Sequence, residues 1–149
     1  MYTHILISTD GSELAQNGVD HGLSLAKALG SKVTIVTVTE PFSGSGTIGY
    51  TGWSTLGVEM EKFEARSEKE AQAILALVKE AADKMGLTAE TIHATNPFPA
   101  AAIVETAKEQ DCNLIVMAAH GRRGIRRALL GSQAAEVVST SNIPVLVIR

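Results

Sequence analysis

Cysteine is nearly absent from this sequence, which has only Cys112 in 149 residues. A disulfide framework and a zinc site built on paired cysteines are therefore excluded. No apolar run reaches the roughly 18 residues that a membrane span requires, so we expect no membrane partner. The start of the chain lacks the pattern of a signal peptide, and we expect a cytoplasmic protein. The formal net charge is −3, which argues against nucleic acid as a partner.

The composition is that of an ordinary globular protein, with 45% hydrophobic and 19% charged residues. The length suggests one domain over residues 1–149. Short apolar runs alternate with longer amphipathic segments. Five runs have the length and residue types of strands: 4–8, 32–38, 89–94, 113–119 and 144–148. The alternation predicts an α/β fold, a doubly wound parallel sheet with helices on both faces.

Helix-start and helix-stop residues support this division. Ser12, Pro99 and Ser132 stand where helices would begin, and Gly30 and Gly86 stand where two would end. The last strand would lie at an edge of the sheet. Exposed strand edges invite pairing with another chain, so we expect a homodimer joined through residues 144–148.

Residues 41–58 hold five glycines and no charge, which predicts a long loop that acts as a lid or is disordered. Within it, GSGTIG (44–49) matches the dinucleotide fingerprint G-x-G-x-x-G. It neither follows its strand directly nor opens a helix, so that interpretation is disfavoured. The chain has no G-x-x-x-x-G-K-[ST] and is not a P-loop protein. A phospho-accepting receiver domain is also excluded, because the acid pair after the first strand and the acid closing the third are missing.

The polar, glycine-rich segments STDGS (8–12) and AAHGRRG (118–124) follow the first and fourth strands. In open α/β sheets, ligands bind beyond the carboxyl ends of strands, where the strand order reverses. If these two strands are neighbours, both segments line one crevice. Asp10 could then accept hydrogen bonds from a base or ribose, or hold Mg²⁺.

The segment after the fourth strand has the features of an anion site. Gly131 and Ser132 stand at a helix start, where unpaired N–H groups attract phosphate. Arg122 and Arg123 could form charge-assisted bonds with phosphate oxygens. Each feature alone is explained as well by a helix cap, a turn or a solvated loop. Their coincidence at two strand ends favours an anion site, and the whole set suits a nucleotide.

At these residues the sequence resembles the universal stress protein family. The family pattern is G-x-x-G, nine residues, then G-[ST], and here AAHG (118–121), nine residues and Gly131–Ser132 follow it. ILISTDGSE near the start and NIPVLVIR at the end agree as well. The resemblance implies a five-stranded sheet of order 3-2-1-4-5, a dimer through the last strand, and ATP as a bound ligand.

The resemblance also implies roles for particular residues. Thr9 and Asp10 would contact the nucleoside, and Val38 would pack on adenine. The phosphates would be held by Gly121, Gly131, Ser132 and the N–H of Gln133. Met117 and His120 also match the surroundings of the motif.

Two positions depart from the family pattern. The first motif glycine is Ala118, and if that position requires a positive φ, alanine costs roughly 1–2 kcal/mol. If the backbone must lie against a phosphate, the methyl group obstructs it. Pro97 stands where the family commonly has glycine. Both substitutions weaken the ATP hypothesis without removing it.

Three functions therefore remain under consideration. The first is a dimeric stress-response protein that senses ATP, with at most slow hydrolysis, because no dedicated base or metal cluster is evident. The second is an interaction protein of the same fold that binds no nucleotide. The third is an enzyme, such as a phosphatase or nucleotide transferase, using Asp10 and His120. It is disfavoured, because no partner is placed beside His120 by the sequence and a structural role is favoured there.

Overall fold

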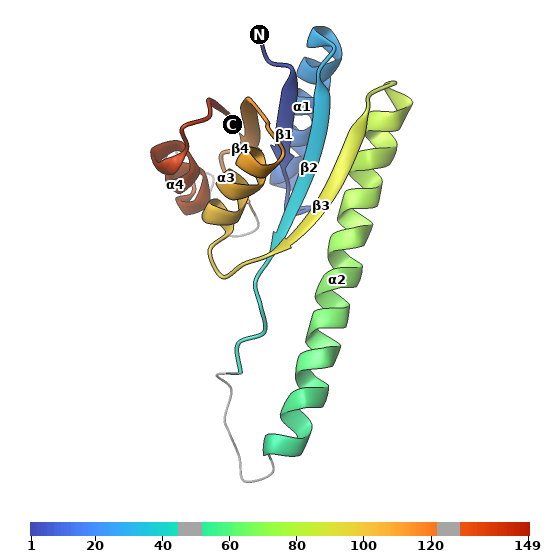
Figure 1. Ribbon diagram of the computed structural model, residues 1–149, viewed down its shortest axis with the longest axis vertical. Helices are drawn as coiled ribbons and strands as arrows, with labels where there is room; N and C mark the ends of the chain where they lie inside the picture. Colours follow the sequence, from blue (N-terminus) through green and yellow to red (C-terminus); the bar gives the residue numbers. More distant parts are fainter. Residues whose placement is uncertain (45–51, 122–128) are drawn as a thin grey trace.

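The computed structural model describes residues 1–44, 52–121 and 129–149. Strands and helices alternate strictly along these residues (Figure 1). In chain order the elements are β1 His4–Ser8, α1 Glu13–Leu29, β2 Lys32–Thr39, α2 Gly52–Lys84, β3 Ala89–Thr95, α3 Pro99–Glu109, β4 Leu114–Ala118, α4 Ser132–Thr140 and β5 Val145–Ile148.

The strands form one parallel sheet of order β3-β2-β1-β4-β5, which confirms the predicted fold class and strand order. β1 pairs with both β2 and β4, with Ile5 opposite Val33 on one side and Leu114 on the other. The chain runs outward from β1 to β3 and then returns to β4, so the order reverses between β1 and β4. β5 lies at an edge of the sheet, as predicted.

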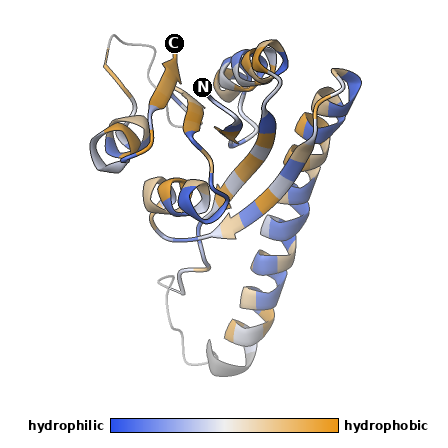
Figure 2. Ribbon diagram, turned by 45° about the horizontal axis from the view of Figure 1, so that its top comes forward, coloured by the Kyte–Doolittle hydropathy of each residue, from blue (hydrophilic) through white to orange (hydrophobic). Residues whose placement is uncertain are grey.

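Two apolar layers bury the sheet on both faces. On one face, Val19 and Leu23 of α1 and Leu75 of α2 pack with alternate residues of the strands. On the other face, Ile103 of α3 and Val137 of α4 pack with the residues between them. Burial on both faces explains the nearly continuous apolar runs of the central strands (Figure 2).

Helix α1 lies directly on the backbone of the sheet. A Cβ atom added to Gly18 would stand 2.7 Å from the backbone nitrogen of Ala118, and one added to Gly22 would stand 2.7 Å from Cδ1 of Ile7. Gly18 therefore allows α1 to approach the end of β4 that precedes the predicted anion site, and Gly22 allows it to approach β1.

Helix α2 begins at Gly52, so the prediction of a loop through residue 58 is wrong for 52–58, while 45–51 lie outside the described residues. Each glycine in a helix costs about 1 kcal/mol relative to alanine, but a helix once formed extends cooperatively. The segment before it contributes contacts: Phe42 packs against Phe63 with ring centroids 5.4 Å apart. The half of α2 that begins at Gly52 extends beyond the sheet (Figure 1).

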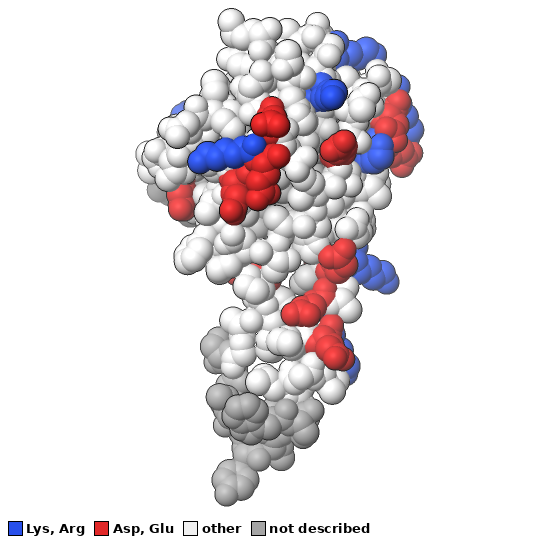
Figure 3. Space-filling view, viewed as in Figure 1, with Lys and Arg blue, Asp and Glu red and all other residues white. Residues whose placement is uncertain are grey.

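The surface carries both signs of charge. Acidic and basic side chains are interspersed over the face seen in Figure 3, several of them along α2. None of the helices in the described ranges combines the length and the apolar character that a bilayer crossing demands.

Candidate functional site

A crevice of about 300 Å³ opens at the carboxyl ends of β1, β2 and β4. Every predicted site residue within the described ranges lines it: Thr9, Asp10, Val38, Met117, Ala118, His120, Gly121, Gly131, Ser132 and Gln133. Arg122 and Arg123 lie outside the described residues, and their predicted contact with phosphate stays a prediction. The two segments that follow β1 and β4 thus share one crevice because these strands are neighbours.

The segment after β1 is held by its own side chains. Asp10 Oδ1 accepts a hydrogen bond from the N–H of Ser12 at 2.9 Å, and Ser12 Oγ accepts one from the N–H of Ala15 at 3.2 Å, which caps α1. Thr9 Oγ1 accepts one from the N–H of Gly11 at 3.1 Å. Gly11 has a φ of 76°, a conformation that glycine adopts without strain. The Asp10 carboxylate is therefore held at the crevice wall.

The later motif glycines stand where an added side chain would meet close neighbours. A Cβ atom on Gly121 would collide with Oδ2 of Asp10 across the crevice. A Cβ atom on Gly131 would lie 2.7 Å from the carbonyl oxygen of Ala119, which accepts a hydrogen bond from the Gly131 N–H at 2.8 Å. Gly131 therefore allows the start of α4 to lie against the backbone that follows β4, and a side chain at Gly121 would displace the Asp10 carboxylate.

The first turn of α4 opens into this space. Gly131 is the N-cap, and Ser132 and Gln133 line the crevice. The N–H groups of a first helical turn have no acceptor within the helix and carry the positive end of its dipole. The Gln133 side chain is engaged elsewhere, since its Oε1 accepts a hydrogen bond from the N–H of Ala100 at 3.0 Å. Gln133 therefore joins the starts of α3 and α4.

Ala118 carries no backbone strain. Alanine at this motif position would be strained only if the position required a positive φ. Ala118 lies in β4, and among the non-glycine residues that the structure describes, only Asp111 has a positive φ. The consequence of Ala118 is thus confined to the space that its methyl group takes, and Ala118 is one of the residues that line the crevice. Pro97 is not among the residues that line the crevice.

Apolar side chains also line the crevice, and the sequence predicts only some of them. Val38 and Met117 are predicted, and Pro99 and Ile103 of α3 join them. Glu40 also lines the crevice, two residues beyond Val38. The strand-end argument that selected Asp10 could have selected Glu40. The position of Pro99 and Ile103 depends on how α3 packs, which the sequence does not reveal.

Metal binding by protein side chains alone finds no support in the described residues. Over those ranges, no group of three or more histidine, cysteine, aspartate or glutamate side chains is placed to hold a metal ion. Asp10 and Glu40 are the carboxylates on the crevice wall within the same ranges. One or two carboxylates are what Mg²⁺ commonly takes from a protein when phosphates complete its coordination.

The fold and the crevice define a class: a doubly wound α/β protein with a crevice at the point where its strand order reverses. Gly121, Gly131 and the start of α4 line this crevice. The family model for the universal stress protein family matches residues 1–149. The chain belongs to this family.

Individual relatives agree with the family model. The chain is 33% identical to universal stress protein YxiE of Bacillus subtilis over the full length of both proteins. Among solved structures it resembles MJ0577 of Methanocaldococcus jannaschii, with a TM-score of 0.80 and 25% identity over 99% of this chain and 96% of that one. It also resembles a universal stress protein in complex with cAMP, with a TM-score of 0.71 and 26% identity over 99% and 97% of the two chains.

Proposed function

We propose that this protein binds an adenine nucleotide, with ATP the expected ligand, and acts as a sensor or regulatory module in a stress response. The observation that carries the proposal is that the Asp10 carboxylate, Gly121 and the start of α4 line one crevice. A Cβ atom on Gly121 would displace the Asp10 carboxylate, and one on Gly131 would collide with the backbone at Ala119. The solved relative in complex with cAMP supports an adenine nucleotide as the class of ligand.

Different residues of the crevice suit the base, the ribose and the phosphates of a nucleotide. The apolar side chains of Val38 and Ile103 would pack on the base, and Thr9 and Asp10 would receive the ribose. The N–H groups of the α4 start and the Ser132 hydroxyl would hold the phosphates. A volume of about 300 Å³ is at the lower end of small-molecule sites, so part of the triphosphate would extend into solvent. Mg²⁺, if bound with ATP, would be shared by the phosphates and Asp10.

The proposal includes a homodimer through β5. Val145 and Leu146 belong to this edge strand, and Leu146 is 38% exposed. One side of β5 pairs with β4, and its other side is an edge that a second copy could extend. A cytoplasmic location remains a prediction from the sequence.

Hydrolysis would be slow at most. Among the described residues that line the crevice, the ionisable side chains are Asp10, Glu40 and His120, and none is a lysine or arginine that could stabilise a transferring phosphoryl group. The alternative is an interaction protein of the same fold that leaves the crevice without nucleotide. Ala118 favours that alternative, because it places a methyl group where the family pattern has glycine.

The test begins with protein purified without added ligand, denatured, and analysed by chromatography for released adenine nucleotide. Binding of a fluorescent ATP analogue is then compared between the wild type, Gly121→Val and Gly57→Val. Valine at 121 would enter the space of Asp10 and should abolish binding, whereas a Cβ at Gly57 meets no atom within 4 Å and should change nothing. Ala118→Gly should strengthen binding if the methyl group is an obstacle.

Two results would count against the proposal. Equal binding by the wild type and Gly121→Val would place the ligand outside this crevice. No binding by the wild type at millimolar nucleotide would favour the interaction protein.

A further inference from the structure

Three side chains from three elements form a continuous hydrogen-bonded chain beside the crevice. His93 of β3 lies between them, with its Nδ1 2.5 Å from Oε2 of Glu68 in α2 and its Nε2 2.7 Å from Oγ1 of Thr39 in β2. The His93 side chain is only 9% exposed. Neither the family motif nor the crevice accounts for this arrangement.

One tautomer of His93 satisfies both contacts. With the proton on Nδ1, the ring donates to the Glu68 carboxylate and accepts at Nε2 from the Thr39 hydroxyl. The other oxygen of Glu68 accepts from Nε2 of Gln72 at 2.9 Å. The hydrogen bonds from Gln72 and then His93 lower the pKa of Glu68, so its charged form is the one favoured. These hydrogen bonds from Glu68 through His93 to Thr39 therefore connect the end of β2 to α2.

The end of β2 needs such a tie because it has a neighbouring strand on one side only. β1 ends at Ser8, opposite Val36, whereas β3 continues to Thr95, opposite Thr39. Thr9 extends the contact with β2 as far as Thr37, whose Oγ1 donates to the carbonyl oxygen of Thr9 at 2.9 Å. Beyond Thr37, Val38 and Glu40 line the crevice. Successive side chains of a strand point to opposite faces, so Thr39 points toward α2 while Val38 lines the crevice.

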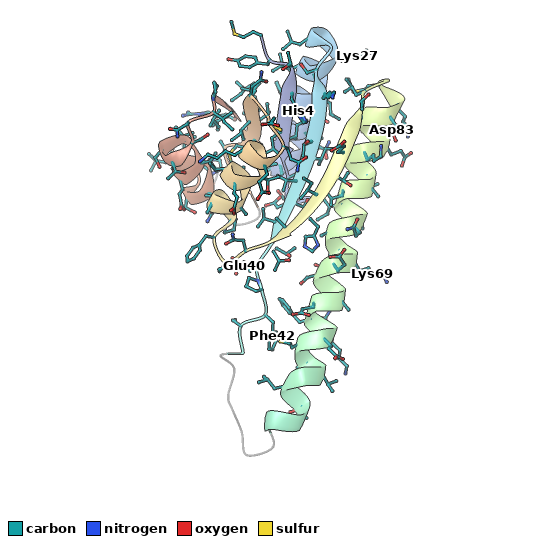
Figure 4. All side chains as sticks on the ribbon, viewed as in Figure 1. His4, Lys27, Glu40, Phe42, Lys69 and Asp83 are labelled. Carbon is teal, nitrogen blue, oxygen red and sulfur yellow. The ribbon has the colours of Figure 1, made fainter. Side chains whose placement is uncertain are left out.

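The crevice wall and the α2 side are also joined by Glu40. This residue lines the crevice and also a groove of about 590 Å³ that contains Thr39, Glu68 and His93. Figure 4 places Glu40 where the chain leaves the sheet on the way to Phe42 and α2. Displacement of Thr39 would therefore move its two neighbours, Val38 and Glu40, on the crevice wall.

We propose that His93 is a positioning residue for nucleotide binding: by holding Thr39 against α2, it sets the position of Val38 and Glu40 on the base side of the crevice. This inference rests on the proposed function. Through this contact α2 would influence the affinity for nucleotide, although none of its described side chains lines the crevice.

The chain offers a matched control for the test. His4 of β1 makes the same kind of contact with the same strand, since its Nε2 lies 2.8 Å from Oγ1 of Thr34 in β2. This contact is at the end of the sheet away from the crevice, and His4 and Glu40 mark the two ends in Figure 4. His93→Ala and His4→Ala thus each remove one histidine–threonine hydrogen bond from β2.

The affinity for ATP is measured by calorimetry on both variants, with hydrogen exchange at the backbone amides of residues 38–40. His93→Ala should weaken ATP binding about fivefold, the worth of one such hydrogen bond, and should raise exchange at 38–40. His4→Ala should leave both unchanged. His93→Gln keeps an acceptor for the Thr39 hydroxyl and should restore most of the affinity. Thr39→Val removes the hydroxyl at constant shape and should weaken ATP binding as much as His93→Ala does. It replaces His93→Ala in the test if that variant folds poorly.

The outcomes separate this inference from the proposed function. Unchanged affinity in His93→Ala, or an equal loss in His4→Ala, would overturn the positioning role while nucleotide binding by the wild type stands. Failure of the wild type to bind ATP would overturn the proposed function and, with it, the role of His93 in nucleotide binding. Unchanged exchange at 38–40 in His93→Ala would refute the tie itself, whatever the ligand.

Discussion

Replacement of Gly18 by alanine should destabilise the protein, although alanine is the better helix former. Gly18 lies within α1, where the change from glycine to alanine is worth about 1 kcal/mol in favour of the helix. The added methyl carbon would stand 2.7 Å from the backbone nitrogen of Ala118 and 3.1 Å from the carbonyl carbon of Met117. Backbone atoms of a central strand cannot rotate away, so α1 must shift from β4.

The magnitude follows from two opposing terms. Overpacking of a well-packed interior costs typically about 1–3 kcal/mol, and the gain in helix propensity offsets about 1 kcal/mol of it. We expect a net loss of up to about 2 kcal/mol in the free energy of unfolding. Gly57 provides the matched comparison, because it lies within α2 and a Cβ there meets no atom within 4 Å. Gly57→Ala should stabilise by up to about 1 kcal/mol.

Urea unfolding measures both effects, as a shift of the midpoint at constant slope. The expected shifts have opposite signs, downward for Gly18→Ala and upward for Gly57→Ala. Stabilisation by both substitutions would refute the close packing of α1 on β4, and with it the position of the crevice wall at Ala118.

Three further predictions concern other parts of the molecule. Burial raises the pKa of the Cys112 thiol to about 11. Native protein should therefore resist thiol alkylation near neutral pH, whereas urea-unfolded protein should react. Rapid labelling of the folded protein would contradict the burial of this thiol. Hydrogen bonds from Gln72 and His93 lower the pKa of Glu68 from 4.5. The stability that the charged Glu68 carboxylate contributes is therefore present above pH 4.5 and lost as the pH falls. The melting temperature of Glu68→Gln should depend less steeply on acid pH than that of the wild type. Leu146→Lys should convert a β5-joined dimer to a monomer in light scattering, and an unchanged mass would exclude that interface.

The sequence predicts most of the fold because the local signals agree with the tertiary structure. Apolar and β-branched runs mark all the strands within a residue or two of their observed ends. The rule that ligands bind beyond the carboxyl ends of strands places Asp10 and Gly121 in the same crevice from the sequence alone. The predicted start of α2 is wrong, because Gly52 and Gly57 are typical of loops and yet a long helix includes them at modest cost.

The parts that the sequence did not predict depend on contacts between distant residues. Glu68 and His93 are 25 residues apart, and His93 and Thr39 are 54 apart, so no local pattern connects them. The backbone conformation at Ala118 also required the structure, since a motif alone does not state whether its glycine is kept for a positive φ or for space. The structure shows that space alone is at issue there.

Nuclear magnetic resonance titration with ATP tests the central claim most directly, because it reports both binding and position. The amide signals of Val38, Ala118, Gly131 and Gln133 should shift together and saturate as ATP is added, while that of Leu29 at the far end of α1 should not move. Absence of any shift at millimolar ATP, or shifts that leave these crevice residues unaffected, would contradict the account.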